Sequence, residues 1–136
     1  MRTIQNLEEL NIPSKYRDYI SKYIENIADL PFINRVILFG SCARGGVSSH
    51  SDIDIFVTVN REISEAEEFL ISSDRLPDYN AATSISTDIL VQPETTFNKF
   101  INTTCMIQKQ VQYYGVDLSG LISKCSGNGT SGNKLD

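Results

Sequence analysis

The residue types best suited to chemistry lie in one stretch, residues 36–59, with the sequence VILFGSCARGGVSSHSDIDIFVTV. A Gly-Ser pair, Gly40 and Ser41, follows an apolar run, and two aspartates, Asp52 and Asp54, open the next apolar run. Glycine permits a tight turn and the close approach of a ligand to the backbone. A helix that begins after such a turn presents free N–H groups, which suit a phosphate. Ordinary α/β turns share this strand–Gly-Ser–helix pattern, so the turn alone does not establish a phosphate site.

The alternating pattern of the second run places the two aspartates on one side of a strand. Ile53, Ile55, Val57 and Val59 point to one face, and Asp52, Asp54, Phe56 and Thr58 point to the other. The α-carbons of the two aspartates would lie about 6.5 to 7 Å apart. Carboxylates at this separation repel one another unless a cation lies between them, and hard oxygen ligands suit Mg²⁺. The alternative is a pair of solvated aspartates at the start of a strand.

A third carboxylate, Asp88, lies inside another predicted strand, residues 86–92 (STDILVQ). A charge inside such an apolar run is expensive to bury without a partner. If this strand lies beside residues 52–59 with Asp88 on the same face, three carboxylates converge. A charge on an edge strand, or a cap before a short strand, is the alternative explanation.

The motif Gly-Ser-x-Ala-Arg-Gly at residues 40–45, followed by Ser-Asp-x-Asp at residues 51–54, resembles the minimal nucleotidyltransferase (MNT) domains of the DNA polymerase beta superfamily. The resemblance extends over residues 33–118. It implies an α/β (α+β) fold, in which helices pack on a small mixed β-sheet. It also implies that Asp52, Asp54 and Asp88 are catalytic and hold two Mg²⁺ ions. The positions that it assigns to nucleotide binding are Gly40, Ser41, Arg44 and Ser51.

The reaction implied by this resemblance moves a nucleoside monophosphate, in the first instance AMP, from an NTP to a hydroxyl group. The hydroxyl attacks the α-phosphorus and pyrophosphate leaves, with two metal ions stabilising the entering and leaving oxygens. Asp88 is the best candidate for the general base, because its oxygen could accept the proton of the acceptor. Arg44 either contacts phosphate or ties the short helix to an acidic neighbour, and the sequence does not choose between these roles.

The acceptor is defined by the resemblance alone. Related minimal enzymes often act with a separate helical partner of the HEPN type (higher-eukaryote-and-prokaryote nucleotide-binding), as antitoxins that attach AMP to a tyrosine of the partner. The resemblance therefore implies ATP or another NTP as donor, a HEPN-type toxin as partner, and a homo- or hetero-oligomer. Two alternatives stay open: transfer to a small molecule such as an aminoglycoside, and a non-catalytic module that neutralises a toxin by contact. Three mutually repelling aspartates argue against the last, since binding alone does not require them.

Length and composition indicate one ordinary globular domain, with 136 residues, 40% hydrophobic and 21% charged. The net charge of −5 argues against a broad nucleic-acid-binding surface. No apolar stretch approaches the roughly 20 residues of a membrane-spanning helix, and the N-terminus lacks the apolar core of a signal peptide. Three widely spaced cysteines indicate free thiols in a reducing compartment. We therefore expect a cytoplasmic protein with no membrane association.

The remaining pattern predicts the helices that position these residues. A helix from Pro13-Ser14 to Pro31 would bury a stripe at helical spacing, formed by Ile20, Tyr23, Ile24 and Ile27. Ser41 is predicted to cap a helix that begins at Cys42, and Ser64 to cap a helix in which Phe69 is buried.

One long helix, capped by Thr95 or Thr96, is predicted to end at Gly115. Residues 1–11 are polar and predicted to be loose apart from a helical turn near Leu7. We expect residues 1–118 to form the nucleotidyltransferase domain. Residues 119–136 are predicted to form a C-terminal tail, which is Gly/Ser/Asn-rich and predicted to be disordered from about residue 126.

Overall fold

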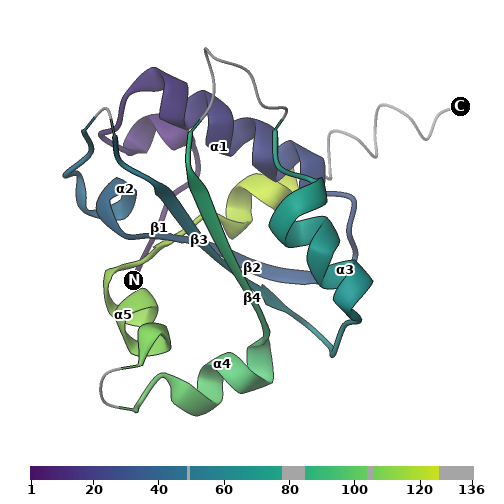
Figure 1. Cartoon of the computed structure of the whole chain (residues 1–136). Helices are drawn as coiled ribbons and strands as arrows, with labels where there is room; N and C mark the ends of the chain where they lie inside the picture. The colour runs from purple at the N-terminus through teal and green to yellow at the C-terminus, as the bar shows by residue number, and fades with distance from the viewer. Residues whose placement is uncertain (49, 78–84, 104–105, 126–136) are drawn as a thin grey trace, which may run out of the picture.

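The computed structural model describes residues 1–48, 50–77, 85–103 and 106–125, and these form a mixed sheet with helices on both faces (Figure 1). The sheet has five strands in the order β1-β5-β2-β3-β4. The strands are β1 (Arg2–Thr3), β2 (Ile33–Phe39), β3 (Ile53–Val59), β4 (Thr87–Pro93) and β5 (Val116–Asp117). β2 is antiparallel to β3 and β5, whereas β3 is parallel to β4 and β1 to β5. The predicted α+β class with a small mixed sheet is confirmed.

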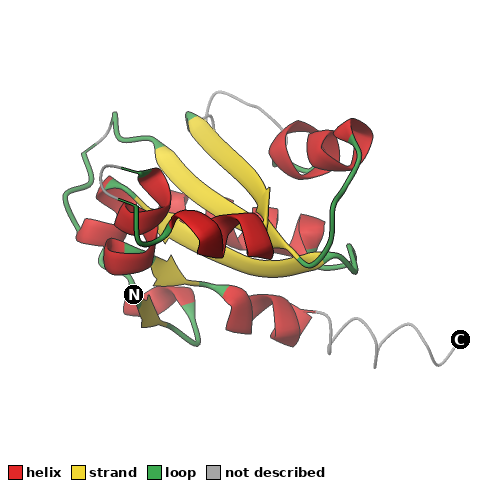
Figure 2. Ribbon diagram, turned by 90° about the horizontal axis from the view of Figure 1, so that it is seen from below, coloured by secondary structure: helices red, strands yellow, loops and turns green. Residues whose placement is uncertain are grey.

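The helices are short apart from the first, and Figure 2 shows them on both sides of the sheet. They are α1 (Ser14–Ile27), α2 (Ser41–Arg44), α3 (Glu65–Phe69), α4 (Glu94–Phe100) and α5 (Ile107–Tyr114). A single 3₁₀ turn, η1 (Leu7–Glu9), and a π-helical turn, η2 (Leu70–Asp74), complete the set with further helical residues at 119–125. Within the described residues, no helix is long and apolar enough to cross a membrane.

The two faces of β3 contribute to two separate hydrophobic cores. Ile53, Ile55, Val57 and Val59 are all buried in the larger core, which also contains the apolar stripe of α1. Phe56 points to the other face and joins the smaller core with Ile37, Phe97 and Val111, under α4 and α5. The predicted alternation of β3 and the predicted buried stripe of α1 are therefore confirmed.

Three predicted helix boundaries are wrong for local reasons. α1 ends at Ile27 and not at Pro31, because a residue before proline is disfavoured in the helical conformation and the chain turns earlier, with the Leu30 N–H bonded to the Ile27 carbonyl. The predicted long helix is two helices, α4 and α5. Asn102 and Thr103, which favour helices poorly, fall between them. α4 is capped by Pro93 and not by a threonine.

The capping prediction at Ser64 is confirmed, but the residue predicted to be buried after it is not. The Ser64 hydroxyl accepts a hydrogen bond from the Glu67 N–H, and the Glu67 carboxylate accepts one from the Ser64 N–H. Phe69 is nevertheless 58% exposed, and Ile71 is the buried residue. The π-helical turn begins at Leu70, after Phe69, and its extra residue per turn rotates the side chains that follow, Ile71 among them, relative to an α-helical register.

Both ends of the described chain pack against the body of the fold. β1 pairs with β5, and Ile4 and Leu10 are buried in the larger core, so residues 1–11 are part of the structure and not loose. Leu121 and Ile122, in the helical residues after β5, pack against the same core. The predicted disorder from residue 126 concerns residues outside the described range.

A half-buried ion pair joins β2 to α4 and yields a stability prediction. The Arg35 guanidinium donates two hydrogen bonds to the Glu94 carboxylate, at 3.0 and 2.6 Å, and Asn34 donates a third at 2.8 Å. Burial pushes the pKa of Glu94 upward, but the bonds from Arg35 and Asn34 outweigh it and hold the pKa below its ordinary value. Such a depressed pKa contributes stability above the unfolded-state pKa of about 4.3, and the contribution is lost as pH falls through the folded-state pKa.

Glu94→Gln is therefore expected to lower the free energy of unfolding at pH 7 by about 1 to 3 kcal/mol. The deficit relative to the wild type should shrink towards pH 3, since the wild-type carboxyl is then being protonated. Urea unfolding followed by circular dichroism at several pH values measures this. Glu25→Gln is the control, because Glu25 is exposed and its pair with Lys22, at 4.0 Å, is too long to contribute much stability. A deficit that stays constant between pH 7 and pH 3 would contradict the electrostatic origin.

Candidate functional site

Asp54 and Asp88 lie side by side across the parallel strands β3 and β4. They are register partners, and neighbouring strands are about 4.8 Å apart, so their side chains leave the sheet on the same face. Asp52 lies two residues before Asp54, immediately before β3 begins. The condition that the sequence left open, with Asp88 on the face of the other two aspartates, is met for the Asp54–Asp88 pair. β4 is also an edge strand and Asp88 is exposed, so the cost of burying a charge does not apply to it.

The three carboxylates act electrostatically on one another. Partial burial raises the pKa of Asp54 above its ordinary value, and the negative charges of Asp88 and Asp52 raise it further. None of the three forms an ion pair with the lysines, arginines or histidine of the described residues. Repulsion of this kind is relieved when a cation binds, so the cluster favours divalent ions electrostatically.

Gly40 is fixed in its position by both its backbone and the neighbouring Asp54. Its φ of 74° lies in the left-handed region, which side-chain-bearing residues rarely adopt. A Cβ atom added to Gly40 would overlap the Asp54 carboxylate and lie only 3.2 Å from its Cγ. The backbone at this turn therefore approaches the carboxylate as closely as only glycine allows.

The turn differs from the prediction in its capping. Gly40 is itself the N-cap of α2, and Ser41 is the first helical residue, not the cap. The strained, left-handed conformation needed at the turn is available only to the glycine, which moves the helix start one residue earlier. α2 contains only four residues, so its dipole is small. A phosphate at this place would rely on the turn itself, where the Ser41 and Cys42 N–H groups precede the first bonds to the Gly40 carbonyl.

Two buried side chains hold the backbone around Asp52, and sequence reasoning missed both roles. The Tyr16 hydroxyl, from α1, donates to the Ser51 carbonyl at 2.8 Å and lies 3.2 Å from the Ser48 carbonyl. The Cys42 thiol donates to the Asp52 carbonyl at 3.5 Å. The sequence carried one signal: a tyrosine in a buried stripe needs a hydrogen-bond partner for its hydroxyl. Burial, with Asp54 and Asp52 nearby, raises the pKa of Cys42 to about 11, so this thiol is a structural group and not a nucleophile.

Arg44 and Ser51, both predicted to contact nucleotide, make other contacts in this structure. The Arg44 guanidinium carbon lies 4.6 Å from the centre of the Tyr114 ring, and Arg44 forms no ion pair with the acidic residues of the described ranges. Of the two roles left open for Arg44, the ion pair to an acidic neighbour is not formed within the described residues, and the Tyr114 ring lies beside the guanidinium instead. The Ser51 hydroxyl accepts a hydrogen bond from the Ser48 N–H at 2.8 Å.

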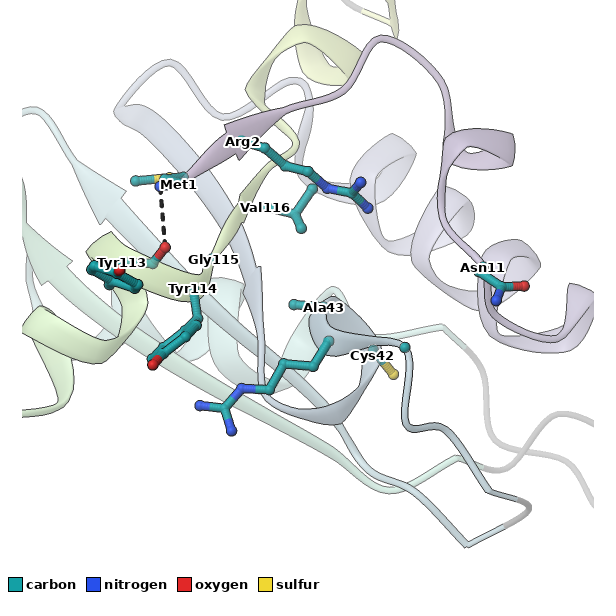
Figure 3. A pocket seen from close by; sticks show the side chains of 11 residues that line it. Met1, Arg2, Asn11, Cys42, Ala43, Tyr113, Tyr114, Gly115 and Val116 are labelled. Carbon is teal, nitrogen blue, oxygen red and sulfur yellow. Dashed lines mark hydrogen bonds between the residues drawn. The ribbon is translucent and has the colours of Figure 1, made fainter.

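Two hollows lie in this part of the fold. The larger, of about 780 Å³, lies between α2 and the end of α5 and is lined in part by Arg2, Asn11, Tyr113 and Tyr114 (Figure 3). The smaller, of about 210 Å³, includes Asp52 itself together with Lys15, Tyr16, His50, Ser51, Ile85 and Ser86. Asp52 thus lines the smaller hollow, and none of the three aspartates lines the larger one.

The aspartates supply the oxygen atoms that Mg²⁺ prefers, but they do not surround an ion. The described part of the chain contains no group of three or more His, Cys, Asp or Glu side chains arranged to hold an ion. Asp54 and Asp88 nevertheless present oxygen atoms from adjacent register positions, with Asp52 close by. Mg²⁺ is usually bound by one or two carboxylates, with waters and substrate phosphates completing its octahedral shell. This donor set matches that incomplete, substrate-dependent kind of site.

Comparison with known proteins identifies a family model and two similar proteins. The family model described as "Polymerase beta, Nucleotidyltransferase" matches residues 20–113. A protein of Methanocaldococcus jannaschii named as a putative protein adenylyltransferase is 29% identical over 114 residues, covering 82% of this chain and 100% of that protein. A solved structure from Sulfolobus solfataricus, described as a putative nucleotidyltransferase, has 24% sequence identity and a TM-score of 0.49, covering 65% of this chain and 78% of that one.

Proposed function

Because the chain belongs to the polymerase beta nucleotidyltransferase family, we propose that it transfers AMP from ATP to a hydroxyl group of a partner protein. The observation that carries the proposal is the register of Asp54 with Asp88, which gathers carboxylates beside the Gly40 turn. A protein as acceptor is supported by the relative named as a putative protein adenylyltransferase. The acceptor group that we propose is a tyrosine of a helical, HEPN-type toxin, so that the chain acts as its antitoxin.

In this proposal the turn at Gly40 binds the triphosphate through the N–H groups of Ser41 and Cys42. Asp52, Asp54 and Asp88 would hold Mg²⁺, which neutralises phosphate charge and lowers the pKa of the acceptor hydroxyl. Asp88 is exposed on the edge strand, so it is open to an incoming acceptor and accepts its proton. The acceptor oxygen then bonds to the α-phosphorus, the bond from that phosphorus to the bridging oxygen breaks, and pyrophosphate leaves.

The remaining contacts of the nucleotide follow from the same arrangement. Arg44 is exposed at the end of α2 and can exchange its contact with Tyr114 for a phosphate oxygen. Ser51 precedes Asp52 and is held in place by Tyr16, so it lies beside the same phosphates. Tyr16 and Cys42 act as positioning residues, because they hold the backbone that carries Asp52.

The test is transfer of label from α-³²P-ATP in the presence of Mg²⁺. The full chain is incubated in parallel with a HEPN-type protein encoded beside its gene and with an aminoglycoside, and each reaction is repeated with EDTA. Label on a tyrosine of the protein, lost with EDTA, is the expected result. Label only on the aminoglycoside would replace the proposal with small-molecule transfer. A tight complex with no label on either acceptor would replace it with neutralisation by contact.

A further inference from the structure

Helix α5 and its N-cap residue expose apolar side chains that nothing in the described structure covers. They are Met106 (40% exposed), Ile107 (41%), Tyr113 (72%) and Tyr114 (49%). Ile107, Tyr113 and Tyr114 lie on one side of α5 by helical spacing, Met106 is the N-cap at its start, and the exposed Gln110 lies between the two ends. The buried side of α5 is a different one and carries Gln108 and Val111. We refer to the four exposed residues as the α5 stripe.

The α5 stripe contains most of the large hydrophobic side chains that are exposed in the described residues. Six large hydrophobic side chains are exposed there, and four of them form the stripe. A fifth, Met1, is adjacent, since its amino group donates to the Tyr113 carbonyl at 3.2 Å. Single exposed apolar residues are normal, but several on one side of a short helix mark an interaction site.

The residue types at the C-terminal end of the stripe are those found at the centres of protein interfaces. The Tyr113 and Tyr114 rings contact each other edge to face, with 4.7 Å between centres, and the Arg44 guanidinium lies against Tyr114. Tyrosine, methionine and arginine are enriched at the centres of protein interfaces. The 780 Å³ hollow opens beside these two tyrosines, as Figure 3 shows, and offers space for a side chain of a partner.

The charges around the stripe define the partner. The sequence from residue 95 to residue 116 contains Lys99 and Lys109 but no aspartate or glutamate, although the whole chain carries a net charge of −5. Arg2 and Arg44 line the adjacent hollow, which has no acidic side chain in its lining. A second copy related by two-fold symmetry would place these cations against one another. The complementary surface is therefore an apolar helix face flanked by carboxylates.

The position of the stripe connects it to the carboxylate cluster. Arg44, which contacts Tyr114, is the last residue of α2, and α2 begins at Gly40 against Asp54. A protein bound along α5 therefore reaches the helix that borders the proposed triphosphate site. We propose that the α5 stripe is the docking surface for the acceptor protein, which presents an apolar helix face flanked by Asp and Glu. The choice of this partner rests on the proposed function.

The docking surface is tested with two synthetic helical peptides that share a leucine stripe, one flanked by glutamates and the other by lysines. Binding to the full chain is followed by fluorescence anisotropy without ATP. We expect the acidic peptide to bind at least about tenfold more tightly than the basic one. Tyr113→Ala and Tyr114→Ala should each weaken the acidic peptide about tenfold. Phe69→Ala is the matched control, since Phe69 is exposed to a similar degree on α3, and it should leave binding unchanged.

Several outcomes would overturn the docking proposal. Equal affinity for the two peptides would show that charge does not select the partner. A loss of affinity in Phe69→Ala equal to that in the tyrosine variants would show that the stripe is not the binding surface. A wild-type dimer in sedimentation velocity that Tyr113→Ala dissociates would make a second copy the occupant. Tighter binding of oligoadenylate RNA than of the acidic peptide, lost in the same variants, would make it a nucleic-acid surface. The outcome is separable from the proposed function: peptide binding without any transfer retains the docking surface, whereas transfer unaffected by both tyrosine substitutions retains the enzyme alone.

Discussion

Asp54→Asn is expected to reduce nucleotidyl transfer at least about a thousandfold while leaving the fold intact. Asp54 is the central member of the cluster, next to Asp88 across the strands and two residues from Asp52. The substitution keeps the size of the side chain but removes a charge that a divalent ion requires. Because burial and its two neighbours already disfavour that charge, its removal should leave the melting temperature equal or higher.

The measurement compares initial rates of label transfer with melting curves for the same samples. Asp52→Asn should behave in the same way, since it removes another carboxylate from the cluster. Asp18→Asn, on the exposed side of α1, is the matched control and should keep both the wild-type rate and the wild-type melting temperature. Retained activity in both Asp52→Asn and Asp54→Asn would refute the assignment of the site.

The glycines at residues 40, 45 and 46 form a natural series for the second prediction. Gly40→Ala should lower the free energy of unfolding by about 2 to 4 kcal/mol, since it combines a left-handed φ with an overlap against Asp54. Transfer by the folded fraction should also fall at least about a hundredfold, because the added methyl displaces the Asp54 carboxylate. Circular dichroism melts and rates per folded molecule separate the two effects.

Gly45 and Gly46 separate the cost of the left-handed backbone from the cost of the overlap with Asp54. Gly45 has a φ of 87°, but a Cβ there meets nothing within 4 Å, so Gly45→Ala should show a conformational cost of about 1 to 2 kcal/mol alone. Gly46 has no left-handed φ and also open space, so Gly46→Ala should be close to neutral in stability. Equal activity per folded molecule in the variants at residues 40 and 45 would show that contact with Asp54 does not matter.

Local patterns predicted most of what positions the site. The alternation of β3 follows from its residues alone, because side chains on a strand point to opposite faces. The stripe of α1 and the capping box at Ser64 are equally local. The register of Asp54 with Asp88 is not local, since a parallel pair depends on how the chain crosses between strands, and the sequence left it as a condition.

What the sequence did not predict depends on contacts between distant segments. The bond from Tyr16 to the loop before Asp52 joins residues 35 positions apart. The contact of Arg44 with Tyr114 depends on where α5 packs, which in turn depends on the break between α4 and α5. The burial of Ile71 falls within a π-helical turn, and no local pattern in these residues distinguishes that turn from an α-helical one.

The parallel pairing of β3 with β4 has a consequence for partial unfolding. Parallel neighbours need a long crossover, here through α3, so Asp88 meets Asp54 only after a large loop has closed. β4 is also the edge strand and is only partly buried, whereas almost all of β3 is buried. Detachment of this one strand would leave the larger core in place and dismantle the carboxylate pair. If the proposed function holds, transfer activity depends on an edge strand, and it should be lost at a lower temperature or denaturant concentration than the global fold.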